Sequence, residues 1–108
     1  MTKNITLKAG KDSLSVPYQL WREALELAKF GGWEAAGTTA PDKYPFREPW
    51  DGAYEWPCGQ TIALADGRHL GMSINGVLAH FSAAIAGAPR KQLATVGKFC
   101  SKGEFSIN

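Results

Sequence analysis

The N-terminal third of the chain changes from apolar residues at every second position to apolar residues at helical spacing. Residues 4–8 alternate between apolar and polar side chains, which predicts a short, half-buried strand. Residues 10–13 are typical of a turn. Residues 17–30 then carry an apolar stripe at helical spacing, preceded by Ser15 as an expected N-cap and followed by Gly31 as a stop. This pattern predicts an amphipathic helix.

A second helical pattern occupies residues 66–85. Residues 60–64 before it form either a strand or the first part of this helix. Gly67, Gly71 and Gly76 interrupt this pattern. Each glycine in a helix interior costs up to about 1 kcal/mol relative to alanine. We therefore expect a helix that depends on tertiary packing and that begins late or kinks.

The C-terminal pattern completes an α+β fold. Pro89 opens a third predicted helix that ends near Gly103, and residues 104–107 alternate as a final strand. We expect one domain over residues 1–108, with a small, mostly antiparallel sheet covered by about three helices. The predicted core takes its apolar residues from each helix: Leu20, Leu27, Phe81, Val96 and Phe99.

Composition narrows the partner classes. The 108 residues are 44% hydrophobic and 20% charged, with a net charge of +2, which is typical of a folded globular protein. No apolar run approaches the roughly 20 residues of a membrane span. So small a charge disfavours a nucleic-acid partner. Four basic residues still fall in the last fifth of the chain, where a solvated helix face is favoured over an anion site: Arg90, Lys91, Lys98 and Lys102.

The N-terminal residues and the cysteines favour a cytoplasmic protein. Residues 1–10 lack the apolar segment of a secretion signal. Cys58 and Cys100 are compatible with a reducing cytosol, and secreted domains of this size usually carry more cysteines. We expect two free thiols, with a single Cys58–Cys100 disulfide as the alternative.

No residue pattern points to catalysis, a metal or a cofactor. His69 and His80 would lie about 16 Å apart on one helix, so one metal ion cannot bind both. To act as a nucleophile, Cys58 would need a basic side chain, such as His69 or His80, brought next to it by folding. The acids near the middle of the chain show no spacing that selects a catalytic pair: Glu48, Asp51, Glu55 and Asp66. A small hydrolase using Cys58 or these carboxylates is therefore the least favoured function.

The most informative segment is the connection over residues 38–59, which holds four of the six prolines. Such a long irregular connection is unusual in a compact domain and is often functional. Within it, the aromatic loop (residues 44–56) carries the candidate binding residues: Tyr44, Phe46, Arg47, Trp50, Asp51, Tyr54 and Trp56. Two interpretations follow. The rings fold back as a structural lid, or they form a recognition surface, since Trp, Tyr and Arg dominate binding hot spots. We expect an ordered loop with at least one ring substantially exposed.

Several short motifs together resemble a known group. They are the helix-to-loop stretch at residues 20–39, Trp-Asp-Gly-Ala-Tyr at 50–54, Gly-Gln at 59–60 and Phe-Cys-Ser-Lys-Gly-Glu-Phe-Ser-Ile at 99–107. The set resembles a group of small bacterial proteins of similar length for which no activity is established. The resemblance implies a bacterial cytosolic protein and assigns no site residues.

The favoured function is a non-enzymatic protein-interaction module, such as a bacterial immunity protein or a phage-type inhibitor. We expect its partner to be another protein, with a homodimer as a further alternative. The alternative is binding of a small ligand, a sugar or a nucleotide, through the aromatic loop, because aromatic rings stack on both.

Overall fold

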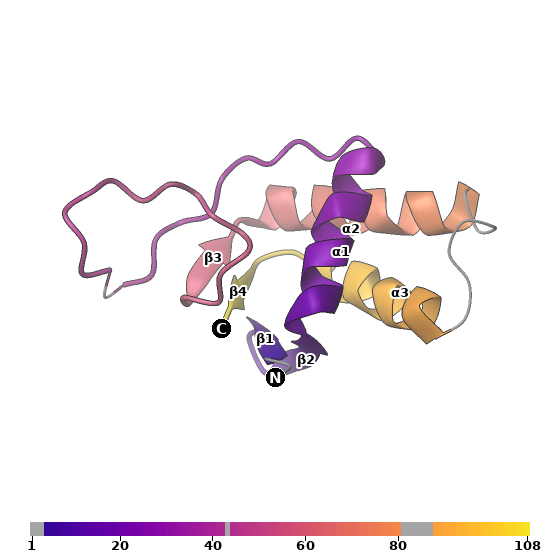
Figure 1. The fold of residues 1–108 in the computed structure, drawn as a ribbon, viewed down its shortest axis with the longest axis horizontal. Helices are drawn as coiled ribbons and strands as arrows, with labels where there is room; N and C mark the ends of the chain where they lie inside the picture. Colours follow the sequence, from indigo (N-terminus) through magenta and orange to yellow (C-terminus); the bar gives the residue numbers. More distant parts are fainter. Residues whose placement is uncertain (1–3, 43, 81–87) are drawn as a thin grey trace.

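The computed structural model describes residues 4–42, 44–80 and 88–108 (Figure 1). The strands are β1 (Asn4–Ala9), β2 (Asp12–Pro17), β3 (Gln60–Ile62) and β4 (Phe105–Ile107), and the helices are α1 (Tyr18–Phe30), α2 (Leu64–His80) and α3 (Ala88–Cys100). These four strands of the described chain form one antiparallel sheet in the order β2-β1-β4-β3. The α+β class predicted from the sequence is confirmed.

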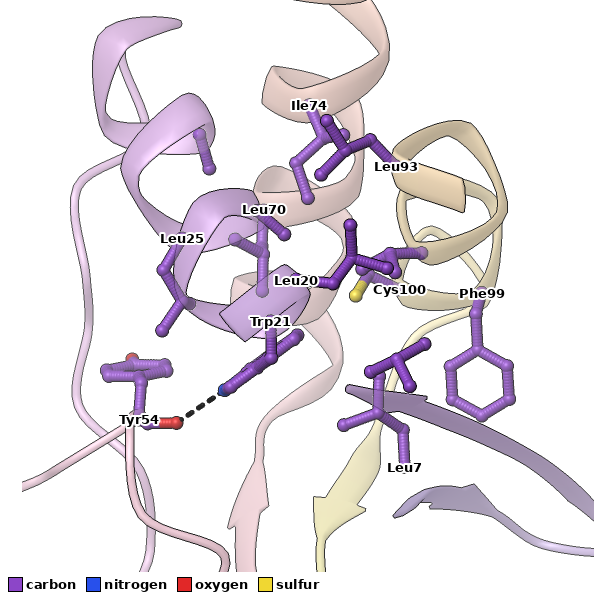
Figure 2. Close-up of a cluster of buried hydrophobic side chains, with 14 of the residues drawn as sticks. Leu7, Leu20, Trp21, Leu25, Tyr54, Leu70, Ile74, Leu93, Phe99 and Cys100 are labelled. Atoms are coloured by element: carbon purple, nitrogen blue, oxygen red, sulfur yellow. Dashed lines mark hydrogen bonds between the residues drawn. The ribbon is translucent and has the colours of Figure 1, made fainter. Parts of the chain in front are cut away.

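The sheet buries one face against the helices. Alternation places Ile5 and Leu7 of β1 and Ile107 of β4 in the core, while Thr6 and Ser106 lie on the other face. The three helices pack against one another, with α1 next to β1 and β2, and the segment between α1 and β3 extends to one side of the molecule (Figure 1). Figure 2 shows how side chains from all three helices meet those of the sheet.

The sequence pattern did not predict strand β2. Gly10 has a φ of +60° and supports a two-residue hairpin loop, so pairing begins at once with Ala9 opposite Asp12. Ser15 is therefore a strand residue, and its hydroxyl lies 3.1 Å from that of Thr6. The prediction of Ser15 as the helix N-cap is wrong, because α1 begins at Tyr18 without a side-chain cap.

The glycines of α2 have a packing role. A Cβ on Gly71 would lie 2.5 Å from the backbone nitrogen of Ser101 and 2.6 Å from the carbonyl oxygen of Gly97. A Cβ on Gly67 would lie 3.2 Å from the carbonyl carbon of Gly103. The two glycines thus allow α2 to approach the C-terminal end of α3 closely. The expected late start is wrong, because α2 begins at Leu64 and is continuous to His80. Residues 81–85 of the predicted helix lie outside the described residues.

Most of the predicted core is confirmed. Leu20, Val96 and Phe99 are buried. Leu27 is partly buried and packs against the core at its margin. Phe81 lies outside the described residues. No helix in the described part of the chain is long and apolar enough to cross a membrane.

Candidate functional site

Tyr54 fixes the C-terminal end of the aromatic loop to the core. Its backbone carbonyl accepts a hydrogen bond of 2.8 Å from the indole Nε1 of Trp21, which projects from α1 (Figure 2). Its phenol accepts a hydrogen bond of 2.7 Å from the backbone N–H of Gly37 and donates one to the carboxylate of Asp66. Only 8% of Tyr54 is exposed. The loop is therefore tied to helix α1 and helix α2 through one residue.

Asp66 is the buried acceptor of this network. It lies in the first turn of α2, where the helix dipole favours a negative charge. One carboxylate oxygen accepts a hydrogen bond of 3.0 Å from Trp33 Nε1, and the other accepts the phenol hydrogen of Tyr54. The rings of Trp33 and Tyr54 meet edge to face at 5.0 Å. A buried carboxylate is tolerated when its oxygens are hydrogen-bonded in this way.

The Tyr54 phenol remains a donor. Burial first, and then the hydrogen bond to Asp66, raises the pKa of Tyr54 above its usual range. The phenol is consequently protonated at neutral pH and can donate to the carboxylate throughout the physiological range. This network holds the loop in place.

Thr38 and Gln60 fix the rest of the loop. The hydroxyl of Thr38 donates to the Ala53 carbonyl at 2.7 Å and accepts from the Trp50 indole at 3.0 Å. The fully buried side chain of Gln60 donates to the Ala53 and Trp56 carbonyls. These bonds satisfy loop carbonyls that would otherwise be desolvated without a partner. The aromatic loop is thus held by side chains both before and after it in the sequence.

The seven candidate residues divide by exposure. Tyr54 is buried, and Tyr44 and Trp50 are half-buried. Phe46 and Trp56 are 65% and 60% exposed, which confirms that at least one ring of the loop faces solvent. Arg47 is exposed, and Asp51 accepts a hydrogen bond of 3.1 Å from the backbone N–H of Ala53, which is typical of a turn.

The exposed rings belong to two separate aromatic groups. Tyr44 contacts both Phe46 and Trp50 edge to face, with ring centroids 5.4 and 5.2 Å apart. Trp56 instead stacks on Tyr18 at the start of α1, at 6.0 Å. A hollow of about 370 Å³ is lined by residues of both groups, and a second hollow of about 290 Å³ lies beside Trp56 above Trp33 and Tyr54. Trp56 lines both hollows.

The residues considered for chemistry are not brought together. No hydrogen bond joins Cys58 to His69 or His80 among the described residues, and the two histidines line a different hollow with Met72. Both thiols are free, Cys58 exposed and Cys100 buried, so the alternative of a disulfide between them is excluded. Burial raises the pKa of Cys100. Residues 4–42, 44–80 and 88–108 contain no group of three or more His, Cys, Asp or Glu residues that could hold a metal ion.

The residues that position the loop were not identified from the sequence. Trp33 was considered only as part of the helix-to-loop stretch at residues 20–39, and Asp66 only as one of four acids near the loop. Gln60 belongs to a Gly-Gln pair whose role is now apparent, since its amide bonds to three loop backbone groups. An acid in the first turn of a helix that follows a long connection was the available signal for Asp66.

The assembled surface offers binding groups. Exposed aromatic faces lie beside the carboxylates of Glu48, Asp51 and Glu55, with the guanidinium of Arg47 close in sequence. No protein-family model, curated protein or solved structure matches this chain, so the geometry of the loop carries the functional interpretation.

Proposed function

We propose that the chain is a protein-binding module whose contact surface is the aromatic loop. The supporting observation is that Phe46 and Trp56 are 65% and 60% exposed, whereas Trp50 and Tyr54 beside them are held by buried or partly buried hydrogen bonds. A ring on a fixed loop loses little conformational entropy when it binds. Trp is also among the residues most enriched at binding hot spots.

The charges around the rings define the partner. Glu48 and Asp51 line the hollow between the two aromatic groups, and Glu55 lines the hollow on the other side of Trp56. A partner that inserts an apolar side chain flanked by basic residues would satisfy both the rings and the carboxylates. The classes expected from the sequence, an immunity protein or a phage-type inhibitor, would use such a surface to cover a partner protein.

Small-ligand binding is the second candidate, and the hollow beside Trp56 favours it. Trp33, Tyr54 and Trp56 line this space of about 290 Å³ together with Asp51 and Glu55. The exposed ring of Trp56 beside carboxylate acceptors suits a sugar, whose hydroxyls donate hydrogen bonds and whose C–H face stacks on a ring. A nucleotide fits less well, because two carboxylates and one lysine, Lys29, line this hollow, so a phosphate would meet more negative than positive charge.

Site-specific photo-crosslinking separates these functions. A benzoylphenylalanine replaces Phe46 in one variant and Met72, which is similarly exposed on α2, in a matched control. The proposal predicts a discrete crosslinked protein, identified by mass spectrometry, from position 46 and none from position 72. A thermal shift with neutral oligosaccharides, in the absence of any protein adduct, would favour the second candidate and contradict the first.

A further inference from the structure

The outer edge of the sheet, strand β2, directs unpaired backbone groups to solvent. Thr6 exchanges backbone hydrogen bonds of 2.7 and 2.9 Å with Asn108, so its N–H and C=O point toward β4 and away from β2. Ser15 lies opposite Thr6, and Ser13 lies two residues away on the same side. Because successive residues of a strand direct their backbone groups to opposite sides, Ser13 and Ser15 direct theirs outward. No described residue hydrogen-bonds to these groups.

Between Asp12 and Pro17, this edge lacks the usual features that prevent strand addition. Residues 13–16 carry no charge, whereas natural edge strands are commonly protected by charged side chains, bulges or a covering segment. Asp12 is the acid of β2, and it pairs with Lys102 at 3.6 Å. Pro17, which has no N–H, ends the strand. Four consecutive residues are thus available to pair with another extended chain.

A basic stripe runs beside the same edge. Lys91, Thr95 and Lys98 are spaced by four and three residues on α3, so they share one helix face, and Lys102 follows in the next turn. Between this stripe and β2 lies a groove of about 240 Å³, lined by Ser13, Leu14, Thr95, Lys98, Phe99 and Lys102. Two of the four basic residues noticed in the sequence, Lys98 and Lys102, therefore line the groove beside the open sheet edge.

We propose that β2 binds an extended acidic segment of a partner protein as a fifth strand of the sheet. The outward N–H and C=O groups of Ser13 and Ser15 supply the main-chain hydrogen bonds, as in other cases of strand addition. Alternate side chains of the added strand enter the groove, where Lys98 and Lys102 favour carboxylates. This site is separate from the aromatic loop and does not depend on the function proposed for it.

Two other occupants fit the edge less well. A second copy pairing antiparallel through β2 would place its helices on the same side of the joined sheet, with Lys98 and Lys102 facing their counterparts. That arrangement brings like charges together. Nucleic acid would use the lysines, but it offers no strand to the backbone groups of Ser13 and Ser15, and the net charge is only +2.

The test uses a fluorescein-labelled peptide of alternating glutamate and valine, with binding followed by fluorescence anisotropy. A matched peptide with every backbone amide N-methylated keeps the charge and cannot form the strand. We expect Lys98→Glu/Lys102→Glu and Ser15→Pro each to weaken binding by about tenfold, through lost charge and a lost N–H respectively. Arg68→Glu on α2 and Thr6→Ala, which removes the hydroxyl partner of Ser15, are the controls and retain binding.

Wild-type protein that binds the glutamate peptide but not the N-methylated one supports the proposal, even if Ser15→Pro fails to fold. Equal binding of both peptides would overturn it, because charge alone would then explain the affinity. Tighter binding of an oligothymidine that Ser15→Pro leaves unchanged would also overturn it. So would a concentration-dependent dimer, seen by sedimentation, that blocks the glutamate peptide. Phe46→Ala/Trp56→Ala should bind the peptide as the wild type does, which keeps this test distinct from that of the aromatic loop.

Discussion

Replacing Tyr54 by Phe removes one hydroxyl and keeps the ring that packs against Trp33. The hydroxyl donates to the buried carboxylate of Asp66 and accepts the backbone N–H of Gly37 at 2.7 Å. A hydrogen bond to a charged group contributes about 1.5–3 kcal/mol, and a buried N–H left without a partner costs about 1–3 kcal/mol, less for the partly buried N–H of Gly37. Because Asp66 keeps its bond to Trp33, we expect Tyr54→Phe to lower the free energy of unfolding by about 2–4 kcal/mol.

Urea titration at pH 7, followed by far-UV circular dichroism, measures this loss. Tyr44→Phe is the matched control, because the Tyr44 hydroxyl makes no hydrogen bond to a described residue and the ring is half-buried. The control should stay within about 0.5 kcal/mol of the wild type. A loss below about 0.5 kcal/mol for Tyr54→Phe would refute the role of this network in holding the aromatic loop.

Three further predictions concern packing and pH. Gly71→Ala should lower the free energy of unfolding by about 3 kcal/mol or more, because the added Cβ would meet backbone atoms at the C-terminal end of α3. Gly76→Ala should raise it by about 0.5–1 kcal/mol, because the added Cβ would meet open space. Equal effects of the two substitutions in urea melts would contradict the close contact of α2 with α3. Leu27→Ala should lower the free energy of unfolding by about 1–2 kcal/mol, because Leu27 is only partly buried. A fully buried leucine would cost about 2–5 kcal/mol. A measured loss above about 3 kcal/mol would contradict the position of Leu27 at the margin of the core. Burial raises the pKa of Cys100 above its ordinary value of 9.0, so the stability that the protonated thiol contributes is complete below pH 9 and is lost as the pH rises. The melting temperature of Cys100→Ala should therefore fall less steeply with alkaline pH than that of the wild type. An unchanged slope would count against burial of the thiol.

Local patterns predicted the helices better than the strands. The stripe from Leu20 to Ala28 defines α1 because one helix face repeats within a few residues. Strand β2 has only Leu14 and Val16 on its inner face, and the turn residues before it concealed the alternation. The role of Gly71 depends on Gly97 and Ser101, which lie about 30 residues further along, so no local pattern could distinguish a close helix contact from a kink.

The sequence predicted which segment carries the candidate site but not which of its side chains are buried and which are exposed. Composition indicated the aromatic loop, since large rings among prolines are expected to be ordered. It did not indicate that Tyr54 turns inward while Trp56, two residues later, stays exposed. That difference arises because Asp66 of α2 and Trp21 of α1 both bond to Tyr54, and these partners lie 12 and 33 residues away. Side-chain direction in an irregular loop is set by such long-range bonds.

The central claim, that the aromatic loop is a binding surface, is tested most directly by Phe46→Ala/Trp56→Ala. The two rings are exposed, so their removal should change the free energy of unfolding by no more than about 1 kcal/mol, including the loss of stacking on Tyr18. Stability and partner capture are measured on the same preparation, with Met72→Ala as the control for loss of an exposed apolar side chain. The account predicts a folded variant that no longer retains the protein crosslinked through position 46. A folded variant that retains this partner as the wild type does, or a variant that unfolds, would contradict it.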